Sequence, residues 1–376
     1  MHLRLFKVNN IITETEISEK FRYNGYIKSI KPIGAGHINK TYMVETSEEK
    51  YTLQLINTAI FKDPTGLMQN IYNVTEFLKK KIISRGGDVK RETLSVVKTH
   101  DDCLFYKDSF NRYWRSYIFI DDVITYQEPK NLKVTYYSGY AFGDFLNMLS
   151  DYDMNTLNET IKDFHNTVKR YKDFCKSVND DIANRASFIE KEIEFINKHS
   201  EDYNIILNYI NENKIPLRVT HNDTKLNNLL FDKKSDKPIC ILDLDTVMPG
   251  SLLYDYGDAL RISGSSAAED EEDLDKVHFV MNNFISFTEG FLLATKDSIN
   301  ELELSLLPFS IKLITLEIGM RFLTDYLNND VYFAVHKKDH NLFRAKTQFK
   351  LVTDIENNME QMNMIVERIA RKYERL

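Results

Sequence analysis

A run of polar residues at 221–228, followed by two carboxylates at 243 and 245, has the residue types and spacing for phosphoryl transfer. Asp223 is followed five positions later by Asn228 and then, after fifteen more residues, by Asp243. Phosphoryl transfer needs little covalent work from a protein, so catalysis depends on positioning and on neutralising charge with metal ions. An Asp for the acceptor hydroxyl, an Asn for a metal and a second Asp for the metal on the nucleotide phosphates meet these needs. The order of the three residues therefore predicts phosphotransfer chemistry.

Short apolar segments on both sides would position these residues. Residues 219–220 indicate the end of a strand, residues 229–231 and 239–242 the two strands of a hairpin, and residues 232–238 its turn. That hairpin would bring Asn228 and Asp243 together at one end. Asp and Asn are also common turn residues, so the alternative is a polar loop that merely caps the hairpin. The fixed spacing between two apolar strands favours the chemical interpretation.

Each of the three main residues has a predicted role. Asp223 would orient the attacking hydroxyl and accept its proton late in the transfer. Asn228 and Asp243 would bind Mg²⁺, a hard cation that prefers oxygen ligands and nucleotide phosphates. We expect ATP and Mg²⁺ to be the cofactors.

Three neighbouring residues have supporting roles in this interpretation. His221 is predicted to brace the loop by hydrogen bonds rather than to act as an acid or a base. Lys225 would offset charge that develops on the γ-phosphate, or else lie on the surface as a solvated lysine. Asp245 would either support the metal ligands or close the turn.

The string from residue 220 to residue 228 and the string from residue 243 to residue 250 resemble those of the aminoglycoside phosphotransferase and choline kinase superfamily. Within it, the chain is most similar to the N-acetylhexosamine 1-kinases. The strings that carry this resemblance lie between residues 36 and 258 and are Gly36-His37-Ile38-Asn39, Phe61-Lys62-Asp63-Pro64, Thr220 to Asn228, Asp243 to Gly250 and Leu253 to Asp258.

The resemblance implies an α+β, bilobal, protein-kinase-like fold. Residues 1–120 would form a small nucleotide-binding N-lobe around an antiparallel sheet, and residues 121–376 a larger, mostly helical C-lobe with the catalytic loop and sugar site. Hydropathy patterns predict N-lobe strands at 26–33, 41–45, 51–56, 94–98 and 114–120 and a helix at 70–84. They predict C-lobe helices at 182–213, 274–295 and 299–327, a helical face from residue 134 to 149, and a C-terminal helix from 343.

The nucleotide would contact two segments of the N-lobe. Gly34 and Gly36, with Asn39, lie between two predicted strands, where glycines let backbone amides approach phosphates. Residues 119–123 would form the hinge that binds the adenine edge through its backbone. The hinge residues assigned to this role are Phe119, Ile120 and Asp121.

Gln54 is a departure from most related kinases. In protein and antibiotic kinases the third strand carries a lysine that pairs with the α- and β-phosphates, whereas this strand has Gln54 at that position. Glutamine donates a hydrogen bond but supplies no charge. The N-acetylhexosamine kinases also have glutamine here, so this residue favours that subgroup over the other members of the superfamily. It leaves the role of Glu76, the natural partner of such a lysine, open.

The acceptor site is expected in the C-lobe near Asp223. The resemblance implies that His37 reaches the sugar, that Arg321 binds its hydroxyls or acetamido carbonyl, and that Tyr332 adds a hydroxyl and an apolar face. Ile262 would pack on the sugar ring. Arg321 and Asp325 are four residues apart on a predicted helix, so an ordinary surface pair is the alternative.

These features predict an ATP-dependent kinase that phosphorylates the anomeric hydroxyl of N-acetylglucosamine or N-acetylgalactosamine. Another small alcohol of the aminoglycoside, choline, homoserine or methylthioribose type is the first alternative, and a nucleotide-binding regulatory module is the second. A protein kinase is disfavoured because Asp-Phe-Gly and Ala-Pro-Glu segments are missing.

The composition of the chain limits the kinds of partner that we expect it to bind. A net charge of −7 argues against nucleic acid. The three cysteines show neither metal-ligand spacing nor a disulfide pattern, and Cys240 is expected in the core. Because the chain shows neither a signal peptide nor a transmembrane segment, we expect a cytoplasmic protein. We also expect a monomer. The acidic run at 268–275 is expected to be a solvated loop before a helix N-terminus.

Overall fold

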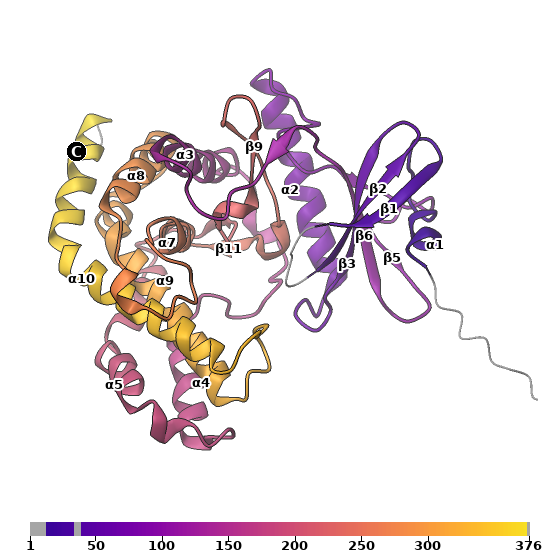
Figure 1. Ribbon diagram of the computed structural model, residues 1–376. Helices are drawn as coiled ribbons and strands as arrows, with labels where there is room; N and C mark the ends of the chain where they lie inside the picture. Colours follow the sequence, from indigo (N-terminus) through magenta and orange to yellow (C-terminus); the bar gives the residue numbers. More distant parts are fainter. Residues whose placement is uncertain (1–12, 34–38, 374–376) are drawn as a thin grey trace, which may run out of the picture. The chain divides into compact units, whose positions relative to one another are not determined.

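The computed structural model describes residues 13–33 and 39–373, so Gly34, Gly36 and His37 lie outside the described residues. The chain divides into two compact units, one of residues 1–76 and 94–121 and the other of residues 77–93 and 122–376. Their content confirms the predicted α+β, kinase-like fold, with an antiparallel sheet near the N-terminus and a mostly helical remainder (Figure 1). The predicted boundary after residue 120 placed residues 77–93 in the first unit, whereas in the structure they belong to the second. Ion pairs of Lys81 with Asp151 and of Arg85 with Asp144 hold this segment there.

The first unit is built on a six-stranded sheet in which every pair is antiparallel. The strand order is β1-β2-β3-β6-β4, and β5 also pairs with β6. Five strands follow the predicted positions, although the predicted strand at 94–98 is reduced to two residues, and the two-residue β5 was not predicted. The bounds are β1 Ile27–Pro32, β2 Lys40–Thr46, β3 Lys50–Ile56, β4 Val96–Val97, β5 Tyr106–Lys107 and β6 Tyr113–Ile118.

Apolar residues on alternate positions of these strands form the core of the first unit. Leu53 of β3 and Trp114 of β6 are buried beside Val44 of β2. The short helix α1 (Glu14–Ser18) adds Ile17 to the same cluster. Because successive strand residues point to opposite faces, the other face of the sheet carries residues such as Gln54 and Arg115.

Helix α2 (Pro64–Ser84) is longer than the predicted helix at 70–84. Its start is set by Asp63, whose carboxylate accepts hydrogen bonds from the backbone N–H groups of Thr65 and Gly66 at 3.1 and 3.0 Å. An aspartate cap followed by proline at the first helical position is a strong start signal. The helix stops before Gly86, which has a positive φ of 73°.

The second unit contains eight α-helices besides the end of α2 in the part of the chain that the structure describes. Two small sheets carry the polar loops between the helices: one has three strands in the order β10-β9-β7, and the other is the pair β11-β8. The bounds are β7 Val123–Ile124, α3 Leu132–Met148, α4 Thr167–Asp180, α5 Glu190–Lys198, α6 Ile205–Asn211, β8 Arg218–Thr220, β9 Leu229–Asp232, β10 Pro238–Ile241, β11 Met248–Gly250, α7 Leu252–Ser263, α8 Met281–Thr295, α9 Glu301–Leu327 and α10 His340–Lys372.

Two predicted helices are shorter than expected. The single helix predicted at 182–213 is wrong, because the chain forms α5 and α6 with 3₁₀ turns before each. Asn184, with a left-handed φ of 54°, lies in the irregular segment before α5. The helix predicted at 274–295 begins only at Met281, since Ser265 and Phe279 form an isolated β-bridge that holds the preceding segment extended.

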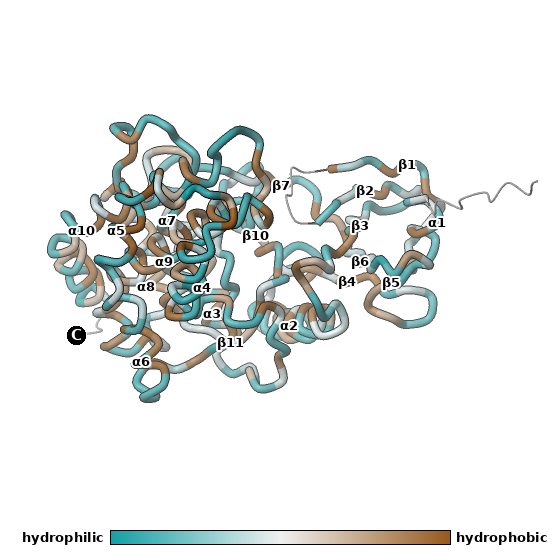
Figure 2. The backbone as a smooth tube through the Cα atoms, turned by 90° about the horizontal axis from the view of Figure 1, so that it is seen from below, coloured by the Kyte–Doolittle hydropathy of each residue, from teal (hydrophilic) through white to brown (hydrophobic). Residues whose placement is uncertain are grey.

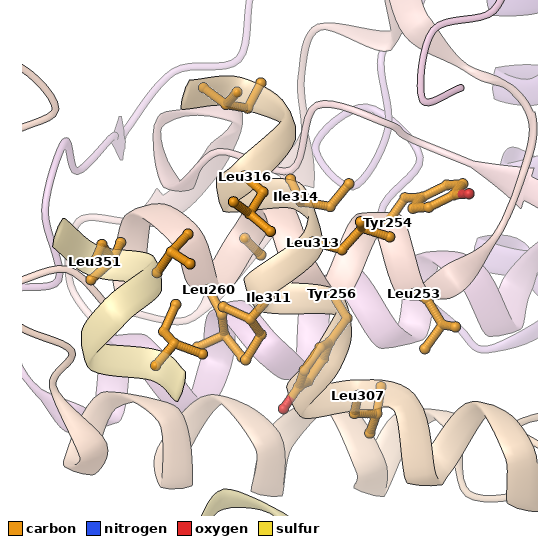
Figure 3. Packing of buried hydrophobic residues seen from close by; sticks show 14 of the residues in the cluster. Leu253, Tyr254, Tyr256, Leu260, Leu307, Ile311, Leu313, Ile314, Leu316 and Leu351 are labelled. Carbon is orange, nitrogen blue, oxygen red and sulfur yellow. The ribbon is translucent and has the colours of Figure 1, made fainter. Parts of the chain in front are cut away.

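Helix α9 forms the centre of the helical unit. Leu307, Ile311 and Ile314 lie against Leu253 and Leu260 of α7 in the same buried cluster (Figure 3). The tube coloured by hydropathy shows apolar stretches of α7, α8 and α9 within this unit and hydrophilic loops around them (Figure 2). Within the described residues, no helix is both long and apolar enough to cross a bilayer.

Gly257 allows α7 and α9 to approach closely. A Cβ atom at this position would lie 2.5 Å from the carbonyl oxygen of Ser310. Any larger residue would therefore push α7 away from α9. The close contact matters for the site described next, because α7 carries the carboxylates that hold the catalytic loop.

Candidate active site

The loop after β8 is held in place by carboxylates from α7. Asp255 accepts hydrogen bonds from the backbone N–H groups of His221 and Asn222, at 2.9 and 2.7 Å. Asp258, one turn further along α7, accepts from the N–H of Thr224 at 3.0 Å. Three backbone N–H groups of the loop are thereby fixed around Asp223. The sequence interpretation placed Asp255 and Asp258 in a matching string but gave them no role.

Asn222 turns the chain so that Asp223 follows it. Its φ of 63° lies in the left-handed region, which asparagine tolerates better than most residues. Its side chain donates to the carbonyl oxygen of Thr246 at 2.9 Å and accepts from the hydroxyl of Thr220 at 3.0 Å. The strained turn is therefore held from both sides by buried hydrogen bonds.

The Asp223 carboxylate lies between a cation and an amide. Lys225 Nζ is 2.9 Å from Oδ1, and the side-chain amide of Asn228 donates to Oδ2 at 3.3 Å. Burial alone would raise the pKa of Asp223, but the neighbouring groups together, chiefly the Lys225 ammonium, outweigh it and hold the pKa below its usual value. Asp223 is therefore ionised near neutral pH, and its side chain remains one-fifth exposed, at 20%.

The hairpin of β9 and β10 brings the two predicted metal ligands to one end. Ile241 pairs with Leu229, and the N–H of Leu242 donates to the carbonyl oxygen of Asn228 at 2.7 Å. Asp243 follows immediately, with a left-handed φ of 54° that turns the chain into a short 3₁₀ helix. The sequence prediction that Asn228 and Asp243 meet at one end of a hairpin is confirmed.

The donor set at this end of the hairpin fits a hard cation. Asn228 Nδ2 donates to the carbonyl oxygen of Asp223 at 2.9 Å, which leaves the amide oxygen as the group for a metal. An amide oxygen and a carboxylate are oxygen ligands that Mg²⁺ accepts, with phosphate oxygens completing its shell. Within residues 13–33 and 39–373 there is no group of three His, Cys, Asp or Glu side chains suited to a metal. A metal held here would therefore take some of its ligands from the protein and the others from the nucleotide phosphates.

His221 links the catalytic loop to the turn that carries Asp243. Its Nε2 lies 2.8 Å from the carbonyl oxygen of Leu242, and its Nδ1 accepts from the N–H of Asp223 at 3.3 Å. This pattern requires a neutral ring with the proton on Nε2. The predicted metal-supporting residue Asp245 is buried in the 3₁₀ turn Leu244–Thr246.

The buried pair of His165 and Glu317, which the sequence interpretation did not include, also supports the loop. His165 Nε2 lies 3.2 Å from the carbonyl oxygen of Asn222, and His165 Nδ1 lies 3.1 Å from Glu317 of α9. Burial alone would lower the pKa of His165, but the Glu317 carboxylate raises it; burial alone would raise the pKa of Glu317, but His165 lowers it. These opposite shifts describe an ion pair. The two residues are 152 positions apart, so no local pattern could have found them.

The contacts of Asp255 lead to a testable pH dependence. Burial raises the pKa of Asp255 to about 6, although the hydrogen bonds from the backbone N–H groups of His221 and Asn222 favour the ionised form. Since an unfolded aspartate titrates near 3.9, the contribution of Asp255 to stability is greatest below that pH and is lost as the pH rises towards 6. Asp255→Asn cannot ionise. We expect its thermal midpoint to be lower than that of the native chain, by a larger amount at pH 5 than at pH 7.5. Equal differences at the two pH values would contradict the raised pKa.

The predicted nucleotide residues that are described lie in the first unit. Gln54 accepts from Arg115 Nε and donates to the hydroxyl of Thr41, each at 3.0 Å. Asn39 accepts from the N–H of Asn57 at 3.0 Å, so it holds the end of β3 as well as the start of β2. In the predicted hinge, the N–H of Phe119 donates to the carbonyl oxygen of Lys50, Ile120 is buried, and Asp121 pairs with the Lys50 ammonium at 2.9 Å.

The predicted sugar residues Arg321 and Tyr332 lie together. The Arg321 guanidinium is 6.0 Å from the Tyr332 ring centre and 3.9 Å from the Glu317 carboxylate. The alternative of a surface pair with Asp325 is wrong. Asp325 is buried and accepts from the backbone N–H groups of residues 331–333, which fixes the loop that carries Tyr332. Ile262 is half-buried in the last turn of α7.

The acidic run at 268–275 is more than the solvated loop predicted from the sequence. Glu269 pairs with the buried Arg261 at 2.7 Å, and Asp270 lies 3.0 Å from His340 at the start of α10. Arg261 also contacts Asp258, the residue that holds Thr224. The run therefore ties the end of α7 to α10. Cys240 is buried in β10, as predicted.

Comparison with known proteins agrees with this geometry. Residues 29–280 match the phosphotransferase enzyme family. This chain belongs to that family. It is therefore a phosphotransferase with an alcohol group as acceptor.

Solved structures of the family share the fold at low sequence identity. An aminoglycoside phosphotransferase from Alicyclobacillus acidocaldarius is 10% identical, with a TM-score of 0.60 and 97% of each chain covered. A microcompartment-associated aminopropanol kinase is 12% identical, with a TM-score of 0.56, over 93% of this chain and 97% of that one. A spectinomycin phosphotransferase in complex with ADP and spectinomycin is 16% identical, with a TM-score of 0.52, over 96% and 98%.

Proposed function

We propose that this phosphotransferase uses ATP and Mg²⁺ to phosphorylate the anomeric hydroxyl of N-acetylglucosamine or N-acetylgalactosamine, giving the sugar 1-phosphate and ADP. In this reaction Asp223 orients the anomeric hydroxyl and takes its proton. Asn228 and Asp243 would hold the metal, which would supply positive charge to the phosphates when bound. Lys225 leaves Asp223 for the γ-phosphate as charge develops there.

One cluster of side chains in the second unit supports this choice of acceptor. We call it the Phe164 cluster, and it consists of Phe164, Arg170, Arg321, Tyr332 and Phe333. The backbone carbonyl of Phe164 accepts from the Arg170 guanidinium at 3.0 Å, while its ring lies 5.4 Å from the Arg321 guanidinium. The centre of the Phe333 ring lies 5.7 Å from the Arg321 guanidinium. Both guanidinium groups are thus fixed on one residue.

The Phe164 cluster is connected to Asp223 through the buried pair described above. Arg321 is one helical turn from Glu317, which contacts His165, and His165 contacts the carbonyl of Asn222, the residue before Asp223. The two guanidinium groups of the cluster outnumber the one buried carboxylate beside them, Glu317, so the cluster has excess positive charge. That charge favours carbonyl and hydroxyl oxygens of an acceptor and repels an ammonium group. The exposed Tyr332 ring, at 52%, offers an apolar face for a sugar.

This charge distinguishes the proposed acceptor from amine-bearing ones. The names of the similar structures include an aminoglycoside phosphotransferase and an aminopropanol kinase, whose substrates carry amines. N-acetylation converts the amine of a hexosamine into a neutral amide with a carbonyl acceptor. The resemblance of the strings at 220–228 and 243–250 to those of the N-acetylhexosamine 1-kinases supports the same choice.

The test compares two acceptors that differ in one group. N-acetylglucosamine and glucosamine are supplied with Mg²⁺ and ATP, ADP release is followed, and phosphorus NMR identifies an anomeric phosphate. We expect kcat/KM for the acetylated sugar to be about 10²-fold higher or more, because a site built for a carbonyl is left unpaired by an ammonium. Turnover of choline, homoserine or an aminoglycoside without turnover of N-acetylhexosamines would refute the proposed substrate and leave the phosphotransferase assignment intact.

Arg321→Met tests the Phe164 cluster directly. Loss of a charged hydrogen bond to the acceptor should lower kcat/KM for N-acetylglucosamine by roughly 10- to 100-fold and narrow the preference over glucosamine. Arg368→Met, which removes an exposed arginine of α10 in the same unit, is the matched control. An unchanged preference in Arg321→Met would show that this guanidinium does not select the acceptor.

A further inference from the structure

The peptide bond between Asn222 and Asp223 is held at both ends by histidine rings. Its carbonyl oxygen, from Asn222, lies 3.2 Å from His165 Nε2. Its N–H, from Asp223, donates to His221 Nδ1 at 3.3 Å. This peptide follows the left-handed turn at Asn222 and comes immediately before the Asp223 side chain. Its orientation therefore sets the direction in which the Asp223 carboxylate leaves the chain.

The two rings hold the peptide with different numbers of protons. His221 accepts at Nδ1, so its ring is neutral. His165 instead faces an acceptor at each nitrogen, because Nδ1 lies 3.1 Å from the Glu317 carboxylate and Nε2 lies against the carbonyl. A neutral imidazole has one donor and one acceptor, whereas an imidazolium donates from both nitrogens. The two contacts of His165 therefore match a ring that carries both protons.

The surrounding charges keep the shared proton on His165 rather than on Glu317. The charged and titratable groups that face this pair from the helices around it are Arg170 of α4, Tyr254 and Asp258 of α7, and Arg321 of α9. Burial alone would lower the pKa of His165, but the carboxylates of Glu317 and Asp258 raise it despite the Arg321 guanidinium. Burial alone would raise the pKa of Glu317, but His165 and the two guanidinium groups lower it.

We propose that His165 is a positioning residue for Asp223 that works only as an imidazolium, and that loss of its second proton sets the alkaline limit of phosphoryl transfer. The charged ring donates to Glu317 and to the Asn222 carbonyl at once. A ring with one proton sets a lone pair against one of these two acceptors, so one contact is lost. The raised pKa means that the contact is present at low pH and is lost as the pH rises through that pKa.

Glu317 makes the loss of this proton costly. Its side chain is fully buried, and its Oε2 has no hydrogen-bond partner among the described residues. Its Oε1 is 3.9 Å from Arg321, beyond hydrogen-bond distance, so His165 provides its one close charged contact in that part of the chain. A buried carboxylate that loses its partner is strongly destabilised. The inference rests on the phosphotransferase assignment and not on the identity of the acceptor.

The protonation state can be observed without nucleotide or acceptor. In protein labelled with nitrogen-15 histidine, long-range proton–nitrogen NMR spectra distinguish a ring with two N–H groups from either neutral tautomer. The signals of His165 are those missing from the His165→Gln/Glu317→Gln variant, which removes both buried charges together. We expect His165 to hold both protons at pH 7.5. A neutral His165 ring at this pH would overturn the proposal.

Glu317→Gln tests the role in phosphoryl transfer, because it removes the carboxylate that holds the proton on His165. The value of kcat is measured from pH 6 to pH 9 with N-acetylglucosamine, or with whichever acceptor of the comparison above is turned over. We expect the ratio of kcat at pH 6 to kcat at pH 8 to rise about tenfold or more, since the alkaline limb moves down by about one pH unit. A native pH profile in this variant would contradict the proposed role.

The double variant guards against a folding defect in Glu317→Gln. Two amides replace the charged pair, so no buried charge is left alone, and circular dichroism with thermal unfolding shows whether the variant is folded. Because neither amide titrates, we expect the alkaline limb of kcat to disappear between pH 6 and pH 9. A native alkaline limb in the folded double variant would show that another group causes it and would overturn the proposal.

A second buried histidine–glutamate pair in the same unit gives a matched control. His199 also faces two acceptors, the carbonyl oxygen of Phe195 at 2.7 Å and Glu356 at 3.0 Å, and it has no contact with the catalytic loop among those described. Glu356→Gln should leave the ratio of kcat at pH 6 to kcat at pH 8 within about twofold of native, because distant sites act independently. An equal change of this ratio in Glu356→Gln and Glu317→Gln would show a general effect on stability and would overturn the positioning role.

Discussion

Asp223→Asn is expected to lower kcat by about 10³-fold or more while ATP affinity and the thermal midpoint stay close to native. The amide has nearly the shape of the carboxylate, so the loop held by Asp255 and Asp258 keeps its backbone bonds. It cannot accept the hydroxyl proton, and it no longer attracts the Lys225 ammonium. The measurement is ADP release at saturating acceptor and Mg²⁺·ATP.

The control for this prediction is Asp236→Asn. Asp236 lies in the turn between β9 and β10, where it bonds to Tyr126 and Lys130, and it has no contact with the catalytic loop among those described. Its substitution should leave kcat within about twofold of native. If Asp223→Asn keeps turnover within tenfold of native, Asp223 is not the residue that receives the acceptor proton.

Asp243→Asn is expected to abolish turnover at Mg²⁺ concentrations that saturate the native enzyme. Asn is the informative replacement because Asp243 has a left-handed φ of 54°, which asparagine tolerates and alanine does not. Asp243→Ala should be inactive as well, but part of its effect would come from backbone strain. The neutral amide loses the charge that draws Mg²⁺ to the triphosphate.

Metal titration separates a lost ligand from a damaged fold. We expect activity of Asp243→Asn to require at least tenfold more Mg²⁺ and to remain below about 1% of native at saturation. Adenosine binding, which needs no metal, should be unchanged. A native Mg²⁺ dependence in this variant would remove Asp243 from the metal site.

The sequence by itself determined the parts of the site that are local. The spacing of Asp223, Asn228 and Asp243 predicted the hairpin that brings the last two together, because a short turn between two apolar strands leaves little conformational choice. The strands of the first unit followed from the period of two in their apolar residues. Long helices such as α9 followed from the helical period of their apolar residues and from the length of the segment.

Only the tertiary structure decided which distant residues hold that site. Asp255 and Asp258 reach the loop from α7, His165 and Glu317 support it from two further segments, and Arg115 meets Gln54 across 61 residues. Such pairings leave no periodic signal, since each depends on packing between elements rather than on spacing within one. The acidic run at 268–275 shows the converse: its composition predicted a solvated loop, whereas contacts with Arg261 of α7 and His340 of α10 convert it into a structural link. Local spacing thus specified the reacting groups, and the packing of α7 and α9 specified how firmly they are held.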